Sequence, residues 1–457
     1  MTAQYQVTGH SAASIAESVE RGIVSGELAP SELLPTVRRL SEDLGVSPGT
    51  VASAYRLLRQ RGLTVSDRRH GTRVRPWRAE HPAGVGGPLP ATRRGWVSPP
   101  GVLDLASGAP DPALLPDLAG VLRDLDYRPA SYGFAPIDAQ LEEVARTELE
   151  ADGVPAASLT CSFGALDAIG RILTTSLRLG DRVAVEDPGW PSLLAGVRAW
   201  GFVPVPVTLD REGVEPGALW DALASGARAV VVTSRAENPT GAALSPARAA
   251  ALAEILARYP GVVTIEDDHG HGITDNPGEL SPLVGPEGSA GQWAFVRSAS
   301  KALGPDLRVA VVAGDEATVA RHDASLAAGG GWVSYLLQQA VGTMWADARL
   351  RRVVARAART YTERRTALVE QLRAEGVEIE APSGLNVWVR VADEATAVSH
   401  LLASGVAVAP GSAFRLASGP AIRVTTAALE ASDAPAVARS IAGARRAGAA
   451  TGAAGGY

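Results

Sequence analysis

The chain contains 457 residues, of which 46% are hydrophobic, and its formal net charge is −6. This length suggests two or three domains, the hydrophobic content excludes a wholly disordered chain, and the negative charge argues against a uniformly basic nucleic-acid coat. Cys161 is the only cysteine, which excludes a disulfide framework and a thiolate metal cluster. The sequence contains no signal-like segment at its start and no apolar stretch of about 18 residues, so we expect a soluble, cytoplasmic protein.

Residues 11–75 contain the patterns of three short helices and a hairpin. Apolar residues recur at every fourth position from Ile15 to Ile23, which predicts the first helix. Thr36 is a suitable N-cap and Gly45 a suitable stop for a second helix. The sequence therefore begins with a small helical unit.

A third helix and a basic hairpin complete this unit. Ser47 is a suitable N-cap for the third helix, and Pro48 suits its first position. The following sequence, LTVSDRRHGTRVRP, predicts two short strands around a basic turn that contains glycine. Helix, turn, helix and basic hairpin together are the plan of a winged helix-turn-helix.

The charge of this segment supports DNA binding. Residues 11–78 contain 11 arginines and 7 acidic residues, a local charge of +4 in a chain whose total is −6. Charged helix faces in small domains also serve solubility, so this excess has a structural alternative. A basic wing directly after a recognition-type helix favours the DNA-binding interpretation.

The remainder of the chain predicts a linker and a large α/β domain. Residues 76–101 are rich in proline and glycine and predict a linker. In residues 102–446, strand-like apolar runs alternate with helical patterns, which predicts a mainly parallel sheet. From about Arg351 to Arg446, a long arginine-rich helix and short strands predict a smaller α+β subdomain. Residues 447–457 predict a disordered tail.

Lys301 is the only lysine among the 43 lysines and arginines, and it follows a predicted strand. In an open parallel sheet, ligands bind beyond the carboxyl ends of the strands. Four loops at this predicted edge carry polar or aromatic side chains. These side chains are Trp190, Asn238, Asp267, Ser298, Ser300, Lys301 and Arg308.

This set of groups predicts pyridoxal 5′-phosphate as the ligand. Its aldehyde needs a primary amine to form a Schiff base, which Lys301 can supply and arginine cannot. A buried carboxylate, here Asp267, is needed to keep the pyridine nitrogen protonated, and the flat ring would stack on Trp190. The phosphate needs hydroxyls, a guanidinium and helix amides. The candidates for these are Ser298, Ser300, Arg308 and the turn near Gly164.

Each of these features also has a structural alternative. The sequence NPTG is a common turn, and acidic residues after a strand often lie in a solvated loop or cap a helix. Trp190 could belong to the core, and a single lysine could lie on the surface. The order, spacing and shared sheet edge of all these groups favour one cofactor site over coincidence.

These motifs resemble two known families. Residues 11–75 resemble the winged helix-turn-helix of the GntR superfamily, through GELAPSELLPTVRRLSEDLGVSPGTVASAYRLLRQRGL and RRHGTRV. Residues 102–446 resemble a fold-type I aminotransferase, an α/β fold with a smaller C-terminal subdomain. A GntR reader joined by a linker to such a domain is similar to the MocR subfamily of bacterial transcription regulators.

The resemblance implies roles for individual residues. Lys301 would hold the cofactor covalently, Asp267 would pair with the pyridine nitrogen, and Asn238 would bind the ring oxygen. Arg423, in AIRVTTAAL, matches the arginine that holds an amino-acid carboxylate. Tyr132, in SYGF, matches a residue that reaches the phosphate from the partner subunit, which implies a homodimer.

The sequence departs from the family pattern at three places. His269 stands where relatives commonly have a tyrosine near the ring oxygen. GALDA replaces a GAQQA-type loop, so the backbone amides of Ala165 and Leu166 remain to bind phosphate. In the recognition helix, Pro48 and Gly49 replace an arginine and a threonine. Matched DNA-binding positions are Arg38, Thr50, Arg69, His70 and Gly71.

Together these features predict a transcription regulator whose aminotransferase-like domain senses pyridoxal phosphate or an amino compound joined to it. As a homodimer it would bind double-stranded DNA at an operator with two half-sites. One alternative is an active aminotransferase that carries a DNA-binding arm. Another is a degenerate domain that binds a different small molecule. We predict no metal site.

Overall fold

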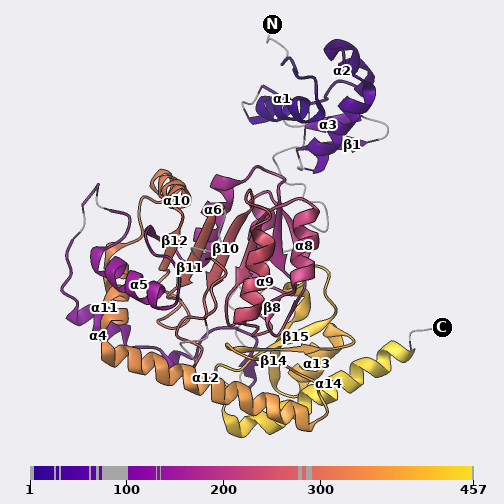
Figure 1. The fold of residues 1–457 in the computed structure, drawn as a ribbon. Helices are drawn as coiled ribbons and strands as arrows, with labels where there is room; N and C mark the ends of the chain where they lie inside the picture. Colours follow the sequence, from indigo (N-terminus) through magenta and orange to yellow (C-terminus); the bar gives the residue numbers. More distant parts are fainter. Residues whose placement is uncertain are drawn as a thin grey trace. The chain divides into compact units, whose positions relative to one another are not determined.

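The computed structural model describes residues 5–24, 27–29, 32–60, 63–67, 71–74, 101–129, 131–133, 135–275, 280–284 and 291–454. The chain divides into two compact units (Figure 1). The smaller unit contains the N-terminal helices and hairpin, and the larger unit contains the strands and helices from residue 101 onward. The predicted linker at 76–101 lies outside the described residues except for its last position.

The N-terminal unit contains three helices and a two-stranded hairpin. The elements are α1 (Ala12–Val24), α2 (Val37–Leu44), α3 (Pro48–Gln60), β1 (Thr64–Asp67) and β2 (Gly71–Val74). The two strands are antiparallel, with Thr64 opposite Val74. A small core of apolar side chains from all three helices holds the unit together.

The predicted caps of this unit are confirmed. The side chain of Thr36 accepts a hydrogen bond from the Arg39 N–H, and Gly45 ends α2 in the left-handed conformation at φ 65°. Ser47 Oγ accepts from the N–H of Thr50 at 3.1 Å. These local interactions fix the ends of α2 and α3, and therefore the turn between them.

The larger unit is built on a seven-stranded sheet with the order β4-β12-β11-β10-β9-β5-β6. Neighbouring strands from β5 to β11 are parallel, and β12 is antiparallel to both β11 and β4. The mainly parallel sheet predicted from the sequence is therefore confirmed. The strands are β4 (Leu159–Ser162), β5 (Arg182–Glu186), β6 (Val203–Val207), β9 (Ala227–Thr233), β10 (Val263–Asp268), β11 (Trp293–Ser298) and β12 (Ala310–Gly314).

Helices pack against this sheet and bury its central strands (Figure 1). The helices are α4 (Leu118–Asp124), α5 (Ala139–Ala151), α6 (Ala165–Ser176), α7 (Pro191–Ala199), α8 (Pro216–Ala224), α9 (Pro246–Leu256), α10 (Glu316–Ala328) and α11 (Tyr335–Ala346). A short hairpin joins β7 (Leu209–Asp210) to β8 (Gly213–Val214). Because the central strands are buried by helices, their sequences are nearly continuous apolar runs.

The C-terminal subdomain contains a four-stranded sheet and three helices. The sheet has the order β13-β15-β14-β3, and its first strand in the chain, β3 (Leu103–Leu105), pairs in parallel with β14. The other elements are β13 (Asn386–Arg390), β14 (Val406–Pro410), β15 (Ala421–Thr425), α12 (Ala348–Ala374), α13 (Glu394–Ala403) and α14 (Ala434–Ala454).

The last helix differs from the sequence expectation. α14 continues to Ala454, whereas we expected a disordered tail from residue 447. The segment is rich in alanine, which has the highest intrinsic helix propensity, so the helix can extend past the last buried residues. In the part of the chain that the structure describes, no helix has both the length and the apolar character needed to cross a membrane.

Candidate functional site

A cavity of about 170 Å³ lies beyond the carboxyl ends of the parallel strands. It is the place where the sequence predicted a ligand, and ten of the predicted cofactor residues line it together with Pro305. The ten residues are Ala165, Leu166, Trp190, Asn238, Asp267, His269, Ser298, Ser300, Lys301 and Arg308.

Lys301 follows β11 and projects its amine into this cavity. Its Nζ donates a hydrogen bond to the carbonyl oxygen of Gly108 at 2.6 Å. Burial, together with the positive charge of Arg423, lowers the pKa of Lys301 to about 8, although the charge of Asp267 opposes the shift. An amine with this pKa is partly uncharged near neutral pH, and the uncharged form is the nucleophile.

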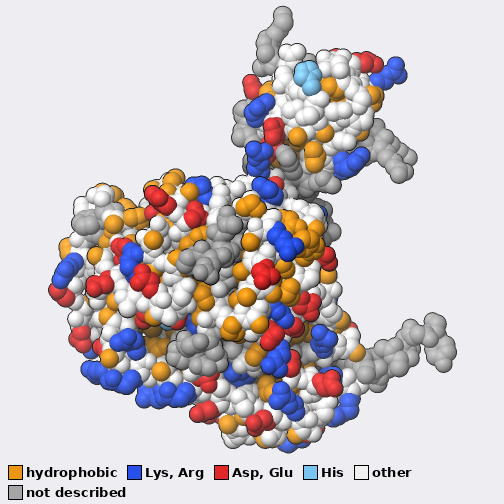
Figure 2. Space-filling view, viewed as in Figure 1, with side chains coloured by type: hydrophobic (Ala, Val, Ile, Leu, Met, Phe, Trp, Pro, Cys, Tyr) orange, Lys and Arg blue, Asp and Glu red, His pale blue; other side chains and the backbone are white. Residues whose placement is uncertain are grey.

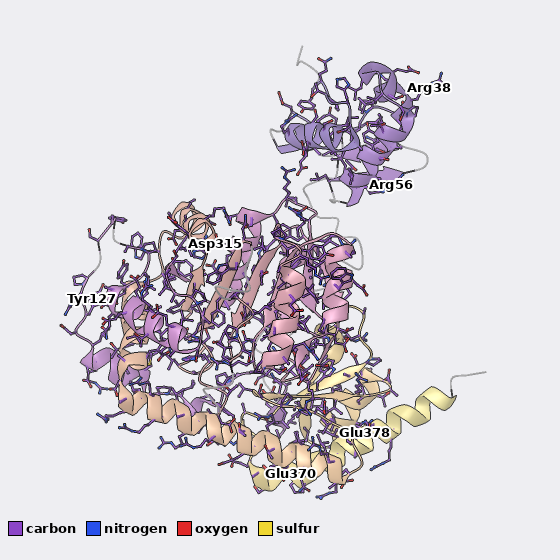
Figure 3. All side chains as sticks on the ribbon, viewed as in Figure 1. Arg38, Arg56, Tyr127, Asp315, Glu370 and Glu378 are labelled. Carbon is purple, nitrogen blue, oxygen red and sulfur yellow. The ribbon has the colours of Figure 1, made fainter. Side chains whose placement is uncertain are left out.

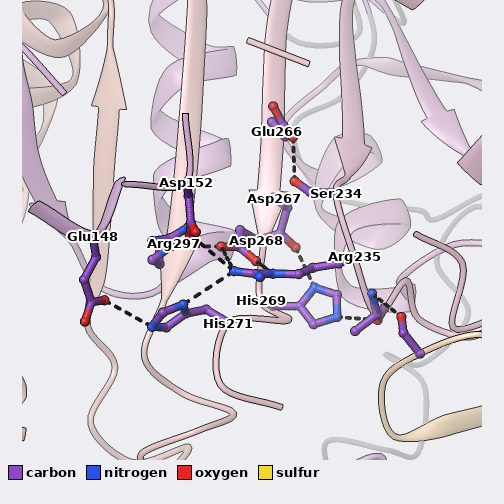
Figure 4. Close-up of polar contacts among 12 residues, drawn as sticks. Glu148, Asp152, Ser234, Arg235, Glu266, Asp267, Asp268, His269, His271 and Arg297 are labelled. Carbon is purple, nitrogen blue, oxygen red and sulfur yellow. Dashed lines mark hydrogen bonds and ion pairs between the residues drawn. The ribbon is translucent and has the colours of Figure 1, made fainter. Parts of the chain in front are cut away.

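Asp267 lies at the end of β10, and its two carboxylate oxygens have different surroundings (Figure 4). Oδ2 faces His269 Nδ1 at 3.0 Å, whereas Oδ1 is buried without a hydrogen-bond partner among the described residues. A buried carboxylate oxygen without a partner is costly unless a ligand supplies the missing donor. Oδ1 is therefore available to a protonated ring nitrogen in the cavity.

His269 contacts and orients the carboxylate of Asp267. Its Nδ1 faces the Asp267 carboxylate, and its Nε2 faces the carbonyl oxygen of Ala236 at 2.9 Å. Burial lowers the pKa of His269, but the hydrogen bond and charge of Asp267 outweigh burial, and the net pKa lies above its ordinary value. Both ring nitrogens face acceptors, and this geometry and the raised pKa favour the imidazolium, whose two N–H groups would donate to Asp267 and Ala236 and hold Asp267 in place.

The acidic residues on either side of Asp267 are already satisfied (Figure 4). Burial raises the pKa of Glu266 to about 7, and this side chain accepts hydrogen bonds from Ser234 Oγ and two backbone N–H groups. Burial acts against the charge of Asp268 as well, but ion pairs with Arg235 and Arg297, at 2.7 and 2.9 Å, outweigh it and lower its pKa. Of the sequence EDD, only Asp267 keeps a free oxygen.

Beyond Asp268, the buried ion pairs continue into a network that the sequence did not reveal. Arg297 also pairs with Asp152 at 2.5 Å, and His271 Nε2 lies 3.3 Å from Glu148 (Figure 4). Glu148 lies in α5 and Asp152 is its C-cap, whereas Arg297 lies on β11, far from α5 in the chain. The network anchors the end of β10 and so holds Asp267 at the cavity.

Asn238 follows β9 and has a fixed orientation. Its Oδ1 accepts hydrogen bonds from Arg423 Nη1 at 3.2 Å and Asn386 Nδ2 at 3.4 Å. With the oxygen engaged by two donors, the Nδ2 group remains to donate into the cavity. The orientation suits an acceptor such as a ring oxygen.

The end of the cavity near the N-terminus of α6 is suited to an anion. Gly164 is the N-cap of α6 at φ 88°, and a Cβ there would lie 2.5 Å from Arg308 Nη2. Arg308 also has a positive φ of 50°, and its Nη2 donates to the carbonyl oxygen of Phe163 at 2.8 Å. Ser300 Oγ is buried here without a partner among the described residues. A guanidinium, a helix N-terminus and a free hydroxyl together suit a phosphate.

Arg423 lies in β15, outside the residues that line the cavity. Its guanidinium donates to the carbonyl oxygen of Ala106 and to Asn238, and lies 4.7 Å over the ring of Phe414. Its Nε is buried without a partner among the described residues. A Cβ at Gly108 would lie 2.7 Å from its Nη1, so the backbone of residues 106–108 lies against Arg423.

Tyr132 is also outside the cavity in this single chain. Its side chain is 89% exposed and packs edge-to-face on Trp332, with ring centroids 5.4 Å apart. Other large hydrophobic side chains are exposed on the two segments that carry Tyr132 and Trp332, including Tyr127, which points outward in Figure 3. With Tyr132 and Trp332, the exposed set consists of Leu122, Tyr127 and Leu336.

The predicted DNA-binding residues lie on the N-terminal unit. Arg38 is exposed on α2 and pairs with Glu42 at 3.2 Å, and Arg56, which the sequence analysis did not single out, projects from α3 (Figure 3). Thr50 lies in the first turn of α3, with Oγ1 2.9 Å from Ser47 Oγ, and Gly71 begins β2. Arg69 and His70 lie outside the described residues.

Comparisons with known proteins define the class of this chain. Residues 101–441 match the family described as aminotransferase class I and II, and residues 11–74 match the bacterial regulatory proteins of the gntR family. The chain belongs to the GntR regulators with an aminotransferase-like domain, the MocR subfamily, as the sequence motifs predicted.

One relative matches nearly the whole chain. It is the vitamin B6 salvage pathway transcriptional repressor PtsJ of Salmonella typhimurium, 39% identical over 430 residues, which cover 93% of this chain and 96% of the relative. The pyridoxine biosynthesis transcriptional regulator PdxR of Corynebacterium glutamicum is 30% identical over 261 residues, about half of each chain. The multiple substrate aminotransferase of Thermococcus profundus has a similar fold, with a TM-score of 0.69 and 21% identity over 78% of this chain and 94% of that one.

Proposed function

We propose that this regulator controls transcription in response to pyridoxal 5′-phosphate bound at Lys301. The observation that carries the proposal is the cavity in which Lys301, with a lowered pKa, lies beside two buried polar atoms without partners, Asp267 Oδ1 and Ser300 Oγ. The names of two relatives, which refer to vitamin B6 salvage and pyridoxine biosynthesis, support the same ligand.

The residues of the cavity fit this cofactor. When bound, pyridoxal phosphate supplies an aldehyde that reacts with primary amines and a ring that withdraws electrons. Lys301 would offer the amine, and Asp267 Oδ1 would accept the proton of the ring nitrogen while His269 holds Oδ2. Asn238 would donate to the ring oxygen, and Trp190 would stack on the ring.

The phosphate would lie at the N-terminus of α6. Arg308 supplies a guanidinium, and the first amides of the helix point toward the same end of the cavity. Two hydroxyls complete the set, and one of them has no other partner. The full set is Ala165, Leu166, Ser298, Ser300 and Arg308.

We further propose that the effector is the vitamer itself and not an amino compound joined to it. A cavity of about 170 Å³ is smaller than the roughly 300–1,000 Å³ of most ligand pockets. Arg423, which would hold the carboxylate of an amino acid, instead donates to Ala106 and Asn238. An amino-acid adduct would have to displace residues 106–108.

We also propose a homodimer that binds two half-sites of an operator. The exposed apolar side chains around Tyr132 form a surface that a second copy would cover, and Tyr132 would then approach the partner's phosphate site. Tyr132→Ser should therefore weaken both dimerisation, measured by analytical ultracentrifugation, and retention of the cofactor. If the variant is a dimer with unchanged retention, this part of the proposal is wrong.

The central experiment measures DNA affinity with and without the vitamer. An operator is first selected from a pool of random-sequence duplexes with the full chain, and its affinity is then measured by fluorescence anisotropy. Pyridoxal phosphate should change the affinity of the unsubstituted protein by about 5-fold or more, as expected for a coupling near 1 kcal/mol. Pyridoxal phosphate should leave the affinity of Lys301→Ala unchanged. An equal response in both proteins would contradict the proposed coupling.

A further inference from the structure

The first half of α12 carries an unusual charge distribution. Residues 348–362 contain five arginines and no acidic residue, although the chain as a whole has a net charge of −6. All five side chains are exposed, and Figure 2 shows Lys and Arg side chains gathered over the start of this helix. The five are Arg349, Arg351, Arg352, Arg356 and Arg359.

Four of these arginines form a stripe along one face of the helix. Arg349, Arg352, Arg356 and Arg359 are separated by three, four and three residues, the spacing that aligns side chains on an α-helix. Neighbouring like charges at this spacing destabilise a helix. The free protein therefore has an unfavourable arrangement here, which an external anion would relieve.

The second half of the same helix is different. There Arg364 pairs with Asp111 and Glu430, at 2.8 and 2.7 Å, and Arg365 is buried and donates to backbone carbonyls. The exposed positions of this half include Glu363 and Glu370, the latter labelled in Figure 3. The arginines of the second half thus stabilise the fold through ion pairs and hydrogen bonds. Among the described residues, the arginine side chains of the stripe make no such contacts.

The acidic residues described near the stripe offset only part of its charge, since the single negative charge of Asp347 attracts both Arg349 and Arg352. Asp347 caps the helix by accepting from the backbone N–H groups of Arg349 and Leu350, at 2.6 and 3.3 Å. Among the described residues, no ion pair involves Arg349, Arg352 or Arg356. Arg351 and Arg359 also line a cavity that contains Asp275, so the charge available to a ligand belongs mainly to Arg349, Arg352 and Arg356.

We propose that this arginine stripe binds the phosphates of duplex DNA, as a second DNA-contacting surface in addition to the winged helix. Ten residues of helix span about 15 Å, and the same length of duplex DNA carries about nine phosphates on its two strands, several of which can face the stripe. Guanidinium groups bind phosphate oxygens in a bidentate manner. A DNA-binding regulator brings that polyanion to the protein, whereas a second copy would oppose the stripe with the same charges.

The test uses the full-length protein without pyridoxal phosphate, so that its result is independent of the proposed effector. Binding to a long duplex of mixed sequence is measured by fluorescence anisotropy between about 50 and 200 mM KCl. In the variant Arg349→Ala/Arg352→Ala/Arg356→Ala, the slope of log K against log salt should become shallower by about two to three, near 0.9 per lost phosphate contact. Alanine favours helix, so the variant should unfold at the same or a higher temperature.

A matched control removes three exposed arginines elsewhere. Arg182, Arg228 and Arg439 lie on β5, β9 and α14, and replacing them with alanine changes the net charge by the same amount. The salt slope of this control should stay unchanged. If the slope became equally shallow in both triple variants, a general charge effect would explain the data. If the slope changed in neither, the stripe would make no contact with DNA. Either result would overturn the proposal.

Chemical protection gives a second measurement that needs no substitution. Hydroxyphenylglyoxal modifies exposed arginines, and mass spectrometry identifies the modified positions. The duplex should protect Arg349, Arg352 and Arg356 and leave Arg228 and Arg439 reactive. Vesicles of phosphatidylglycerol serve as an alternative polyanion. If the vesicles protect the stripe and DNA does not, the surface binds membranes and the proposal is wrong.

Discussion

The cavity and the neighbouring Arg423 differ in whether their polar groups already have partners. Inside the cavity, Asp267 Oδ1 and Ser300 Oγ are buried and unpaired, although burying such atoms is costly. Beside the cavity, both terminal nitrogens of Arg423 already donate, to Ala106 and Asn238, and only its Nε is unpaired. A carboxylate is held best by two guanidinium N–H groups, so the engaged terminal nitrogens favour a site for one phosphorylated ring without a second compound.

The largest effect should come from removing the amine itself. With Lys301→Ala, borohydride should fix no pyridoxal phosphate to the protein, whereas in the unsubstituted chain it should label the peptide that contains Lys301 by mass spectrometry. Lys301→Arg is the matched variant because it keeps the positive charge and loses the primary amine. Labelling of either variant at a comparable level would show that the lysine is not the attachment point.

The next effect is the pH dependence of this attachment. The pKa of Lys301 is lowered to about 8, so the reactive uncharged amine should decrease about tenfold for each pH unit below that value. The rate of attachment, followed by absorbance in the presence of excess vitamer, should fall roughly 50-fold from pH 8 to pH 6 and rise only about twofold above pH 8. A rate that keeps rising to pH 10 would mean that the amine has its ordinary pKa.

Substitutions of Arg308, which lines the cavity, and of Arg423, which lies beside it, test this difference directly. Arg308→Ala removes a charged donor from the proposed phosphate end and should weaken binding of pyridoxal phosphate by about 10- to 100-fold, as expected for a charge-assisted hydrogen bond. Arg423→Ala should weaken it by less than about tenfold, since Arg423 acts through the pKa of Lys301 and not on the phosphate. Pyridoxal, which lacks the phosphate, is the matched ligand because its affinity should not change with Arg308→Ala. Equal losses of affinity for pyridoxal phosphate in the two arginine variants would mean that the cavity and Arg423 do not differ in this way.

Much of the site could be predicted because its signals are local in the sequence. Four loops follow strands of the central sheet, and parallel strands bring such loops to one edge, so seven side chains could be assigned to one cavity. The family resemblance added His269 and the backbone amides of Ala165 and Leu166. The caps Thr36, Gly45 and Ser47 were equally local. Such features depend on residues a few positions apart, which a single sequence displays.

Other features depend on contacts across long sequence distances, and these were missed. β3 pairs with β14 although about 300 residues separate them, and this pairing brings residues 106–108 over Arg423. His269 could be placed near the ring, but its second partner, Ala236, comes from the loop after β9. Asp267 was chosen among the three adjacent acids from the sequence, but the ion pairs of Arg235 and Arg297 that neutralise Asp268 were not foreseen.

The smallest predicted effect concerns how Arg423 acts on Lys301 from a distance. Burial is the larger cause of the lowered pKa of Lys301, and the positive charge of Arg423 is the second. Arg423→Ala removes that charge, so less repulsion opposes the protonated lysine and its pKa must rise. The pH midpoint of the attachment rate should therefore shift upward by less than about one unit, which lowers the rate at pH 7 by less than about tenfold.

The variant Arg423→Lys separates this electrostatic role from carboxylate binding. Lysine keeps the charge, so the midpoint should stay near that of the unsubstituted protein, although lysine cannot reproduce the paired donors of arginine. An amino acid added with pyridoxal phosphate should change none of these rates. A midpoint that moved equally in both variants would mean that the shape of Arg423, and not its charge, sets the pKa of Lys301. If the amino acid changed the rate in the unsubstituted protein and in neither variant, Arg423 would instead have a carboxylate-binding role.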